Sequence, residues 1–207
     1  SSKCGIASYS RRFINFMPDD VYLFSPYNET AEPCHENINL IHDNKLIPSW
    51  NSTPDNDQNL DNLFFQIKVR KISSLVIQFN FGFFNINQLD LLIDKLLASK
   101  INVIIVLHST ISSNLNDYLV FENLLKKCTR VLVHTVNDLN RLRNLNLIDN
   151  VSLFAHPILD FQNVDKKLSK KYKLMSRHKD QISLVSYGFC LPPKGFAELI
   201  QAIHILK

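Results

Sequence analysis

Glycine is scarce in this sequence, with four residues in a chain of 207, whereas an ordinary protein contains about 7%. Because so few are kept, each is expected to meet a backbone requirement, such as a tight turn or a close approach to a ligand. They are Gly5, Gly82, Gly188 and Gly195, and each lies in or beside a predicted turn between a strand and a helix. Ligands usually bind at that edge of an open α/β sheet, although turn geometry alone could explain any one of the four.

Cysteine and charge are limited too. The four cysteines, Cys4, Cys34, Cys128 and Cys190, stand far apart, with no CxxC pair and no histidine at ligand spacing. Neither a zinc site nor a disulfide framework is indicated, and we expect reduced, mostly buried thiols. Charged residues make up 20% of the chain and the formal net charge is +4. That charge is too small for the concentrated basic face that nucleic acid binding requires.

No apolar run approaches the 18 or so residues of a membrane-spanning helix, and no signal peptide is recognised. We therefore expect a soluble, cytoplasmic protein. Residues 165–179 (DKKLSKKYKLMSRHK) are strongly basic and lack a continuous apolar face. A solvated linker is the simple interpretation, and a surface that meets anionic lipid headgroups at the inner face of the membrane is the alternative.

Hydrophobic residues make up 45% of the chain, enough for a sizeable core, and they fall in a pattern of alternating strands and helices. Stretches with helical spacing of apolar residues separate most of the predicted strands, which indicates a Rossmann-like α/β fold with a parallel sheet and helices on both faces. The least regular part is residues 26–57, where four prolines punctuate a polar stretch. The predicted strands are short apolar runs rich in β-branched residues, at 21–24, 75–79, 103–107, 131–133, 151–154 and 182–185.

Polar side chains follow two of these strands directly. Asn80 and Gly82 come after the strand at 75–79, in VIQFNFGFFN, where amides could hydrogen-bond sugar hydroxyls. His108 and Ser109 end VIIVLHST, and a histidine there can donate a hydrogen bond or exchange a proton near neutral pH. Because ligands of parallel sheets bind outside the carboxyl ends of the strands, these residues are candidates for a cleft. For Asn80, ordinary turn packing is an equal alternative.

Two more histidines stand at later strand ends. His134 follows RVLV, and Thr135 after it is expected to cap the next helix. His156 precedes Pro157 where the chain is expected to leave the sheet, so it could line an interdomain seam. Gly5 lies just ahead of a predicted helix, where backbone N–H groups can approach an anion. No strand precedes Gly5 in this chain, and we expect the domain to lack its first strand here.

Taken in order, these segments resemble the retaining glycosyltransferases of the GT-B fold, group 1 or family 4 type. KCGIASYSRRF is similar to the CGIADYTR opening loop of that family, and IQFNFGFF to the strand end IQHEFGIF. VLHST resembles TLHD, and RVLVHTVNDLNRL resembles ADRVIVHSEADRERL. FAHPI is similar to IPHGV, and VSYGFCLPPKGFAELIQAI to LSFGFLRPHKGLEELIEAL. The resemblance covers nearly the whole chain.

The resemblance implies a domain division and a hexosyltransferase activity in polysaccharide biosynthesis. Residues 1–160 would be the Rossmann-like, acceptor-side domain, 161–181 a basic linker, and 182–207 the truncated start of a nucleotide-sugar-binding domain. The implied partners are a nucleotide-sugar donor and a glycan, polysaccharide or glycolipid acceptor, with no metal or other cofactor. We expect the 207 residues alone to be inactive, because the second domain is incomplete.

The resemblance also implies roles for single residues. His108 would be the catalytic residue beside the donor sugar, and Gly5 would approach the donor phosphates. Lys194 would contact the diphosphate, flanked by Gly188 and Gly195 as further donor-binding positions. The acceptor or cleft-lining residues would be Asn80, Gly82, Ser109, His134 and His156.

One departure from the family pattern keeps other interpretations open. Phe189 stands where the family usually has an arginine after the glycine that matches Gly188. This difference favours an alternative in which the chain is a degenerate, glycan- or protein-binding module without catalysis. A different Rossmann-like enzyme, such as an epimerase, would need a glycine-rich first turn after a strand, which KCGIAS does not supply.

Overall fold

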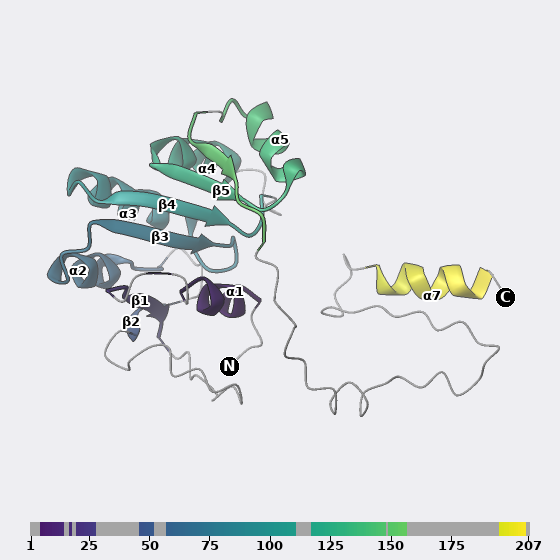
Figure 1. Ribbon diagram of the computed structural model, residues 1–207, viewed down its shortest axis with the longest axis horizontal. Helices are drawn as coiled ribbons and strands as arrows, with labels where there is room; N and C mark the ends of the chain where they lie inside the picture. Colours follow the sequence, from purple (N-terminus) through teal and green to yellow (C-terminus); the bar gives the residue numbers. More distant parts are fainter. Residues whose placement is uncertain are drawn as a thin grey trace. The chain divides into compact units, whose positions relative to one another are not determined.

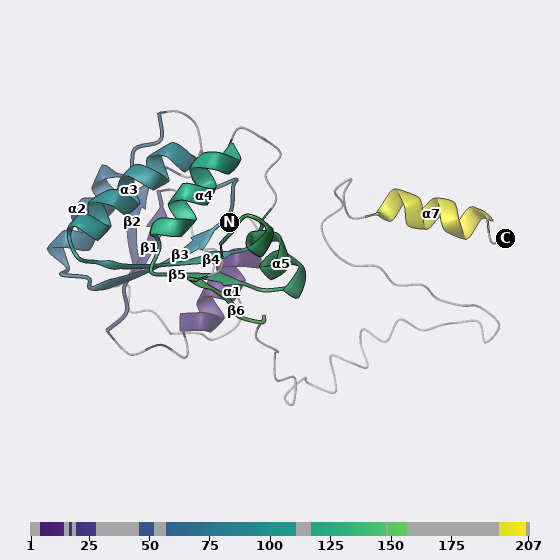
Figure 2. The ribbon, with the colours of Figure 1, turned by 90° about the horizontal axis from the view of Figure 1, so that it is seen from above.

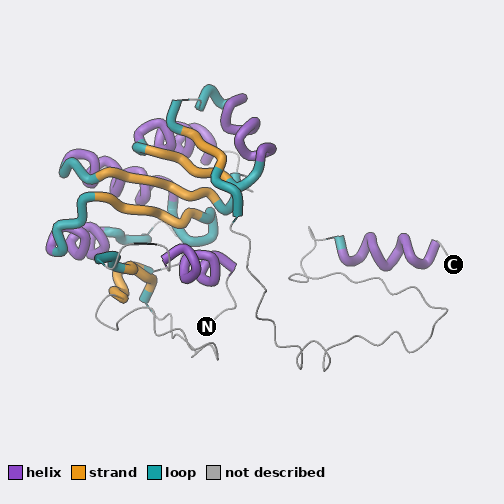
Figure 3. Tube along the Cα trace, in the orientation of Figure 1, coloured by secondary structure: helices purple, strands orange, loops and turns teal. Residues whose placement is uncertain are grey.

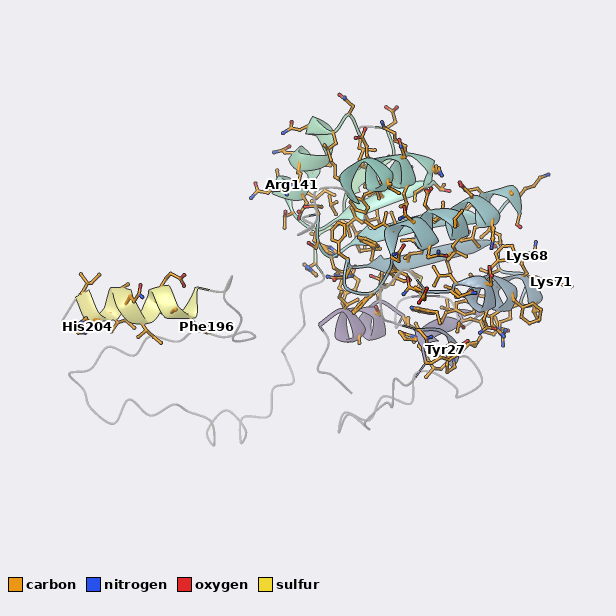
Figure 4. The ribbon with its side chains drawn as sticks, turned by 180° about the vertical axis from the view of Figure 1, so that it is seen from behind. Tyr27, Lys68, Lys71, Arg141, Phe196 and His204 are labelled. Carbon is orange, nitrogen blue, oxygen red and sulfur yellow. The ribbon has the colours of Figure 1, made fainter. Side chains whose placement is uncertain are left out.

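The computed structural model describes residues 5–14, 17, 20–27, 46–51, 57–110, 117–147, 149–156 and 195–205. The chain separates into two compact units, Ser1–Pro157 and Ile158–Lys207. In the second unit the described residues form one helix, α7 (Phe196–Ile205), whose two ends are marked by Phe196 and His204 in Figure 4. The predicted strand at 182–185 and the predicted linker at 161–181 lie outside the described residues. The first unit carries all the other described elements.

The first unit contains two parallel sheets (Figure 1). In the smaller sheet β1 (Leu23–Pro26) pairs with β2 (Leu46–Trp50). The larger sheet has the order β3-β4-β5-β6, and every neighbouring pair is parallel. Its strands are β3 (Ser74–Phe79), β4 (Asn102–Leu107), β5 (Arg130–Val133) and β6 (Val151–Leu153).

The helices flank the larger sheet, as the sequence predicts for an α/β fold. Consecutive parallel strands joined by right-handed crossovers put their connecting helices on one face. Accordingly, α3 packs against both α2 and α4, and Figure 2 shows these three helices on one side of the sheet with α1 on the other. Figure 3 shows the regular alternation of strand and helix along this unit. The helices are α1 (Gly5–Ile14), α2 (Asp61–Val69), α3 (Ile86–Ala98), α4 (Asp117–Lys127) and α5 (Val136–Asn144).

The core lies between the larger sheet and the helices α2 to α4. Side chains alternate along a strand, so Val103, Ile105 and Leu107 of β4 point to the helix face, where they join the main core cluster. Val106 points to the opposite face and is also fully buried. A central strand that is apolar on both sides is what the sequence predicts for a covered parallel sheet.

One strand was not predicted. Residues 26–57 were expected to be the least regular part, yet β2 (Leu46–Trp50) forms there and pairs with β1. Ile47, Ser49 and Trp50 are buried whereas Leu46 and Pro48 are exposed. A proline is tolerated because β2 is an edge strand of a two-stranded sheet, with one side free of the ladder. The paired β1 begins at Leu23, two residues later than the apolar run at 21–24 predicts.

Three helices end without glycine. Lys71, Lys100 and Asn146 follow α2, α3 and α5, and each has a positive φ, between 55° and 60°. After α3, for example, the N–H of Ile101 donates to the carbonyl of Leu96, the 6→1 bond of a Schellman motif. A residue with a Cβ is strained in this left-handed conformation. The low glycine content therefore leaves strained backbone conformations at these three helix ends.

Cys128 confirms the expectation of a reduced, buried thiol. It is a free cysteine packed in the core, and burial raises the pKa of its thiol to about 12. Cys4, Cys34 and Cys190 lie outside the described residues. Across the part of the chain that the structure describes, no helix combines the length and the apolar surface needed to cross a bilayer.

Candidate functional site

Three histidines lie at the carboxyl ends of neighbouring strands. His108 directly follows β4, His134 directly follows β5, and His156 comes three residues after β6. Val106 of β4 is in register with Leu132 of β5, and His108 and His134 each lie two residues further on. Because side chains alternate, both histidines are on the sheet face that carries Val106, away from α3 and α4.

The helix on that face, α1, brings Tyr9 against all three histidines. The ring centroid of Tyr9 lies 4.9 Å from that of His108, 5.2 Å from that of His134 and 5.4 Å from that of His156, each with an edge-to-face geometry. His134 and His156 are stacked at 3.9 Å, and His108 and His134 are 5.0 Å apart. We call Tyr9, His108, His134 and His156 the histidine–tyrosine cluster. Phe13, one turn after Tyr9, extends the contact by packing edge-on against Phe154.

Hydrogen bonds fix the proton positions on two of the rings. His108 Nε2 is 2.7 Å from Gln78 Oε1, and an amide oxygen can only accept, so Nε2 of His108 carries a proton. His134 Nδ1 is 2.8 Å from the carbonyl oxygen of Phe154, so Nδ1 of His134 carries a proton. In their neutral forms the two adjacent rings therefore have opposite tautomers, and the nitrogen left as an acceptor is Nδ1 in His108 and Nε2 in His134.

The cluster disfavours positive charge. Burial, reinforced by the nearby His134 and His156, lowers the pKa of His108 from 6.5 to about 4. The pKa of His156 is also lowered, by burial and then by His134. Burial raises the pKa of Tyr9. At neutral pH, His108 and Tyr9 are therefore uncharged, and a ligand meets neutral hydrogen-bonding groups there.

The described residues of the cluster are not arranged as metal ligands. The rings of His134 and His156 are stacked face to face, and Nε2 of His108 and Nδ1 of His134 are already used as donors. Among the residues that the structure describes, no group of three or more histidine, cysteine, aspartate or glutamate side chains could hold a metal ion.

A second hydrogen-bonded group fixes the loops beside His108 and His134. The buried hydroxyl of Thr110 donates to one carboxylate oxygen of Asp138 at 2.5 Å, and the hydroxyl of Thr135 donates to the other at 2.6 Å. Thr135 also accepts from the backbone N–H of Asp138, which confirms its predicted role as the cap of α5. Asp138 therefore ties the end of β4 to the start of α5 and limits the movement of both histidines.

The remaining candidates in the first unit have separate positions. Gly5 is the first residue of α1, where no positive φ is recorded and a Cβ would meet nothing within 4 Å, so neither a turn conformation nor packing among the described residues requires a glycine there. Asn80 accepts the N–H of Gly82 through its side chain and the N–H of Phe83 through its carbonyl, so it organises a turn. A Cβ on Gly82 would come within 3.3 Å of that side-chain oxygen. Ser109 is half-buried directly after His108.

Of the predicted donor-binding residues, Gly188 and Lys194 lie outside the described residues. Gly195 lies in the second unit, directly before α7, with φ +71°. A side chain would be strained in that conformation, so this glycine does meet a backbone requirement. Its N-terminal position on α7 is the one that the sequence indicates.

Two members of the site were not predicted in their roles. Tyr9 lies in the helix predicted after Gly5 but was not a candidate site residue, and Gln78 is one of the amides of VIQFNFGFFN that could hydrogen-bond sugar hydroxyls. The amide oxygen of Gln78 instead accepts a hydrogen bond from His108. Gln78 is in register with Val106 of β4, and His108 lies two residues beyond Val106, so the two side chains share a sheet face. The sequence alone does not give this register, so no signal in it could have found the pair.

A shallow hollow lies elsewhere in the first unit, between the start of α2 and α3. Gln58, Asp61 and Lys95 are among the residues that line it, and Lys95 donates to Asp61 at 2.6 Å across it. Gln58 is buried there, but its amide is fully used by Asn51, Phe83 and Asn85. None of the candidate residues from the sequence lines this hollow.

Comparison with models of protein families, with curated proteins and with solved structures found no match to this chain.

Proposed function

We propose that this chain is part of a GT-B glycosyltransferase, which moves a sugar from a nucleotide-sugar donor to a glycan, polysaccharide or glycolipid acceptor. The observation that carries the proposal is the histidine–tyrosine cluster: four rings from α1 and from three strand ends meet at the carboxyl edge of a parallel sheet. That edge is where open α/β sheets bind their ligands. The resemblance of six ordered segments to family 4 supplies the reaction.

His108 is the residue that we assign to the donor sugar. Its ring is held by Gln78 through Nε2, which leaves Nδ1 as an acceptor for a sugar hydroxyl. With a pKa of about 4, the ring is neutral under physiological conditions, and neutral hydrogen-bonding groups suit hydroxyls better than phosphates. The diphosphate would be bound in the second domain by Lys194, whose ammonium would offset the charge that develops on the leaving group.

The acceptor side of the proposal uses the rest of the cluster. His134 and His156 would line the acceptor cleft, with Ser109 beside His108. A glycolipid acceptor would require the protein to approach a membrane, and the basic segment 165–179, outside the described residues, would meet anionic headgroups there.

The test is transfer of radiolabelled sugar by the full-length protein that contains these residues, with UDP- and GDP-linked hexoses as donors. His108→Ala is expected to lower kcat at least 100-fold, the usual range for loss of a positioned catalytic group. His204→Ala removes an exposed histidine of α7 and is the control, with unchanged kcat. Unchanged turnover in His108→Ala would remove His108 from the active centre.

The second candidate is a glycan- or protein-binding module without catalysis, favoured by Phe189 in place of the family's arginine. In that case the full-length protein would bind a glycan but would not consume any nucleotide-sugar. Transfer from a single donor would eliminate it.

A further inference from the structure

Two buried polar atoms of the histidine–tyrosine cluster have no hydrogen-bond partner within the described part of the chain. They are the hydroxyl oxygen of Tyr9 and Nε2 of His134. Tyr9 is 7% exposed, and the centroids of the two rings are 5.2 Å apart. Buried groups without a partner are unusual in folded proteins, because each loses its bonds to water and gains none in return. Two such atoms on contacting rings indicate a place for a ligand.

The bonding capacities of these two atoms are complementary. His134 donates through Nδ1 to the carbonyl of Phe154, and in the neutral form of such a ring Nε2 can only accept a hydrogen bond. The hydroxyl of Tyr9 can donate. One alcohol group satisfies both atoms, because its oxygen accepts from Tyr9 and its proton is donated to His134. A carboxylate has no proton to give to Nε2, and hydrogen phosphate, the main form of phosphate at pH 7.5, would bring a double negative charge into a buried site.

The charge of the surrounding groups also favours a neutral ligand. His108 is uncharged at neutral pH because its pKa is about 4, and burial keeps the Tyr9 hydroxyl protonated by raising its pKa. The hydroxyls of Thr110 and Thr135 occupy both carboxylate oxygens of Asp138, the nearby acidic residue. Among the described side chains named in this paragraph, none is a cation that would attract an anion to the unpartnered atoms.

His156 is the exposed residue through which a ligand would reach His134. This residue is exposed, and its ring is stacked on His134 at 3.9 Å. Exposed side chains change rotamer within nanoseconds. Rotation of His156 would uncover the face of His134 on which it is stacked, beside the edge that carries Nε2, without any movement of the sheet.

We propose that Tyr9 and His134 bind one hydroxyl group of a sugar, with Tyr9 donating to the hydroxyl oxygen and His134 Nε2 accepting its proton. This inference rests on the proposed function in taking a sugar acceptor as the ligand. It assigns the acceptor hydroxyl to Tyr9 and His134, and it gives the site a preference for neutral polyols over anions.

The test is an NMR titration of the whole 207-residue chain with ¹⁵N-labelled histidine at pH 7.5. The probes are the methyl glycosides of glucose, galactose, mannose and N-acetylglucosamine, and inorganic phosphate forms a separate arm. At least one glycoside is expected to move the His134 Nε2 resonance upfield, as a newly hydrogen-bonded acceptor nitrogen does, while phosphate leaves it in place. No response to any of the four glycosides, or an equal response to phosphate, would overturn the inference.

Two matched variants separate binding from a structural role. Tyr9→Phe removes only the unpartnered hydroxyl and is expected to weaken glycoside binding about tenfold, with the urea midpoint unchanged or raised. Tyr22→Phe makes the same change at an exposed tyrosine and is expected to leave both quantities unchanged. Undiminished binding, or a lower urea midpoint, in Tyr9→Phe would show that the hydroxyl has no ligand role.

The two proposals can fail separately. Glycoside binding at His134 without sugar transfer by the full-length protein would leave this inference standing and remove the glycosyltransferase. Sugar transfer that is unaffected by Tyr9→Phe, together with no response at His134 Nε2, would support the glycosyltransferase and overturn the assignment of the acceptor hydroxyl to Tyr9 and His134.

Discussion

Among single residues, His108 connects the site most directly to the stability of the fold. Its side chain is held between Gln78, which accepts from Nε2, and the ring of Tyr9. The ionisable groups around it are His134, His156 and Tyr9, and the carboxylate of Asp138 is bonded to Thr110 and Thr135 nearby. Among these described groups, none forms an ion pair with His108 that would stabilise an imidazolium.

This environment predicts a pH dependence of unfolding. The pKa of His108 is about 4 in the folded chain and 6.5 in its ordinary state, so the unfolded chain binds more protons between these values. Stability is then fully present above pH 6.5 and falls as the pH decreases toward 4. The loss is on the order of 1–2 kcal/mol, less than the whole shift would give because part of the ring faces solvent.

Urea unfolding between pH 4 and pH 7.5 measures this effect. His108→Gln keeps a hydrogen-bonding side chain but cannot titrate, and it should flatten the dependence relative to the wild type. The exposed His204 provides the matched change, His204→Gln, which should follow the wild-type curve. Parallel curves for wild type and His108→Gln would mean that this histidine is not shielded from protonation.

At the same scale, the sequence predicted where the histidines stand but not what surrounds them. A histidine directly after an apolar, β-branched run is recognisable because the strand end is recognisable, and this applies to His108 and His134. The contact with Tyr9 could not be predicted, because it depends on which sheet face α1 covers. Nothing in the local pattern around Tyr9 distinguishes that face from the other.

At the scale of elements, the ends of α2, α3 and α5 use non-glycine residues in the left-handed region. Lys71 after α2 has a φ of 55°, where a residue with a Cβ loses about 1–2 kcal/mol. Lys68, three residues earlier, lies within α2 and offers a matched lysine with ordinary helical geometry. Figure 4 labels both residues at this end of the helix.

This pair predicts opposite effects of the same substitution. Lys71→Gly relieves the left-handed strain and should raise the free energy of unfolding by about 0.5–1 kcal/mol. Lys68→Gly places glycine inside a helix and should lower it by about 0.5–1 kcal/mol. Chemical denaturation of the two variants measures both changes in the free energy of unfolding. A loss of stability in Lys71→Gly would show that the lysine side chain stabilises the fold by more than the left-handed backbone strain destabilises it.

The strands of the larger sheet were predictable because each is a compact apolar run between helical stretches. The strand β2 was not, since its sequence Leu46–Trp50 contains a proline and a serine and lies in a polar surrounding. Its stability comes from tertiary contacts, including the burial of Ile47 and Trp50 and the pairing with β1. Such contacts override local propensity and leave no periodic signal in so short a segment.

At the scale of the whole first unit, a row of aromatic rings joins the two sheets. Trp50 of β2 stacks on Phe84 at 5.7 Å, and Phe84 stacks on Phe79 of β3 at 6.3 Å. Phe79 in turn stacks on Phe121 of α4 at 5.2 Å. Through this row the smaller sheet shares the core of the larger one, although no strand of one pairs with a strand of the other in the described topology. A two-stranded sheet is marginal by itself, so we expect β1 and β2 to depend on Phe84.

The chain has a single tryptophan, and its position makes this dependence measurable. In the wild type, unfolding followed by Trp50 fluorescence and by far-UV circular dichroism should coincide, because a shared core unfolds as one unit. Phe84→Ala should cost about 3–5 kcal/mol and should also move the fluorescence midpoint below that of circular dichroism, as the smaller sheet comes away first. Phe65→Ala, at a ring that is 60% exposed on α2, should change stability by no more than about 0.5 kcal/mol and keep the curves together. If the two curves still coincide in Phe84→Ala, the smaller sheet is held to the larger one by contacts other than this aromatic row.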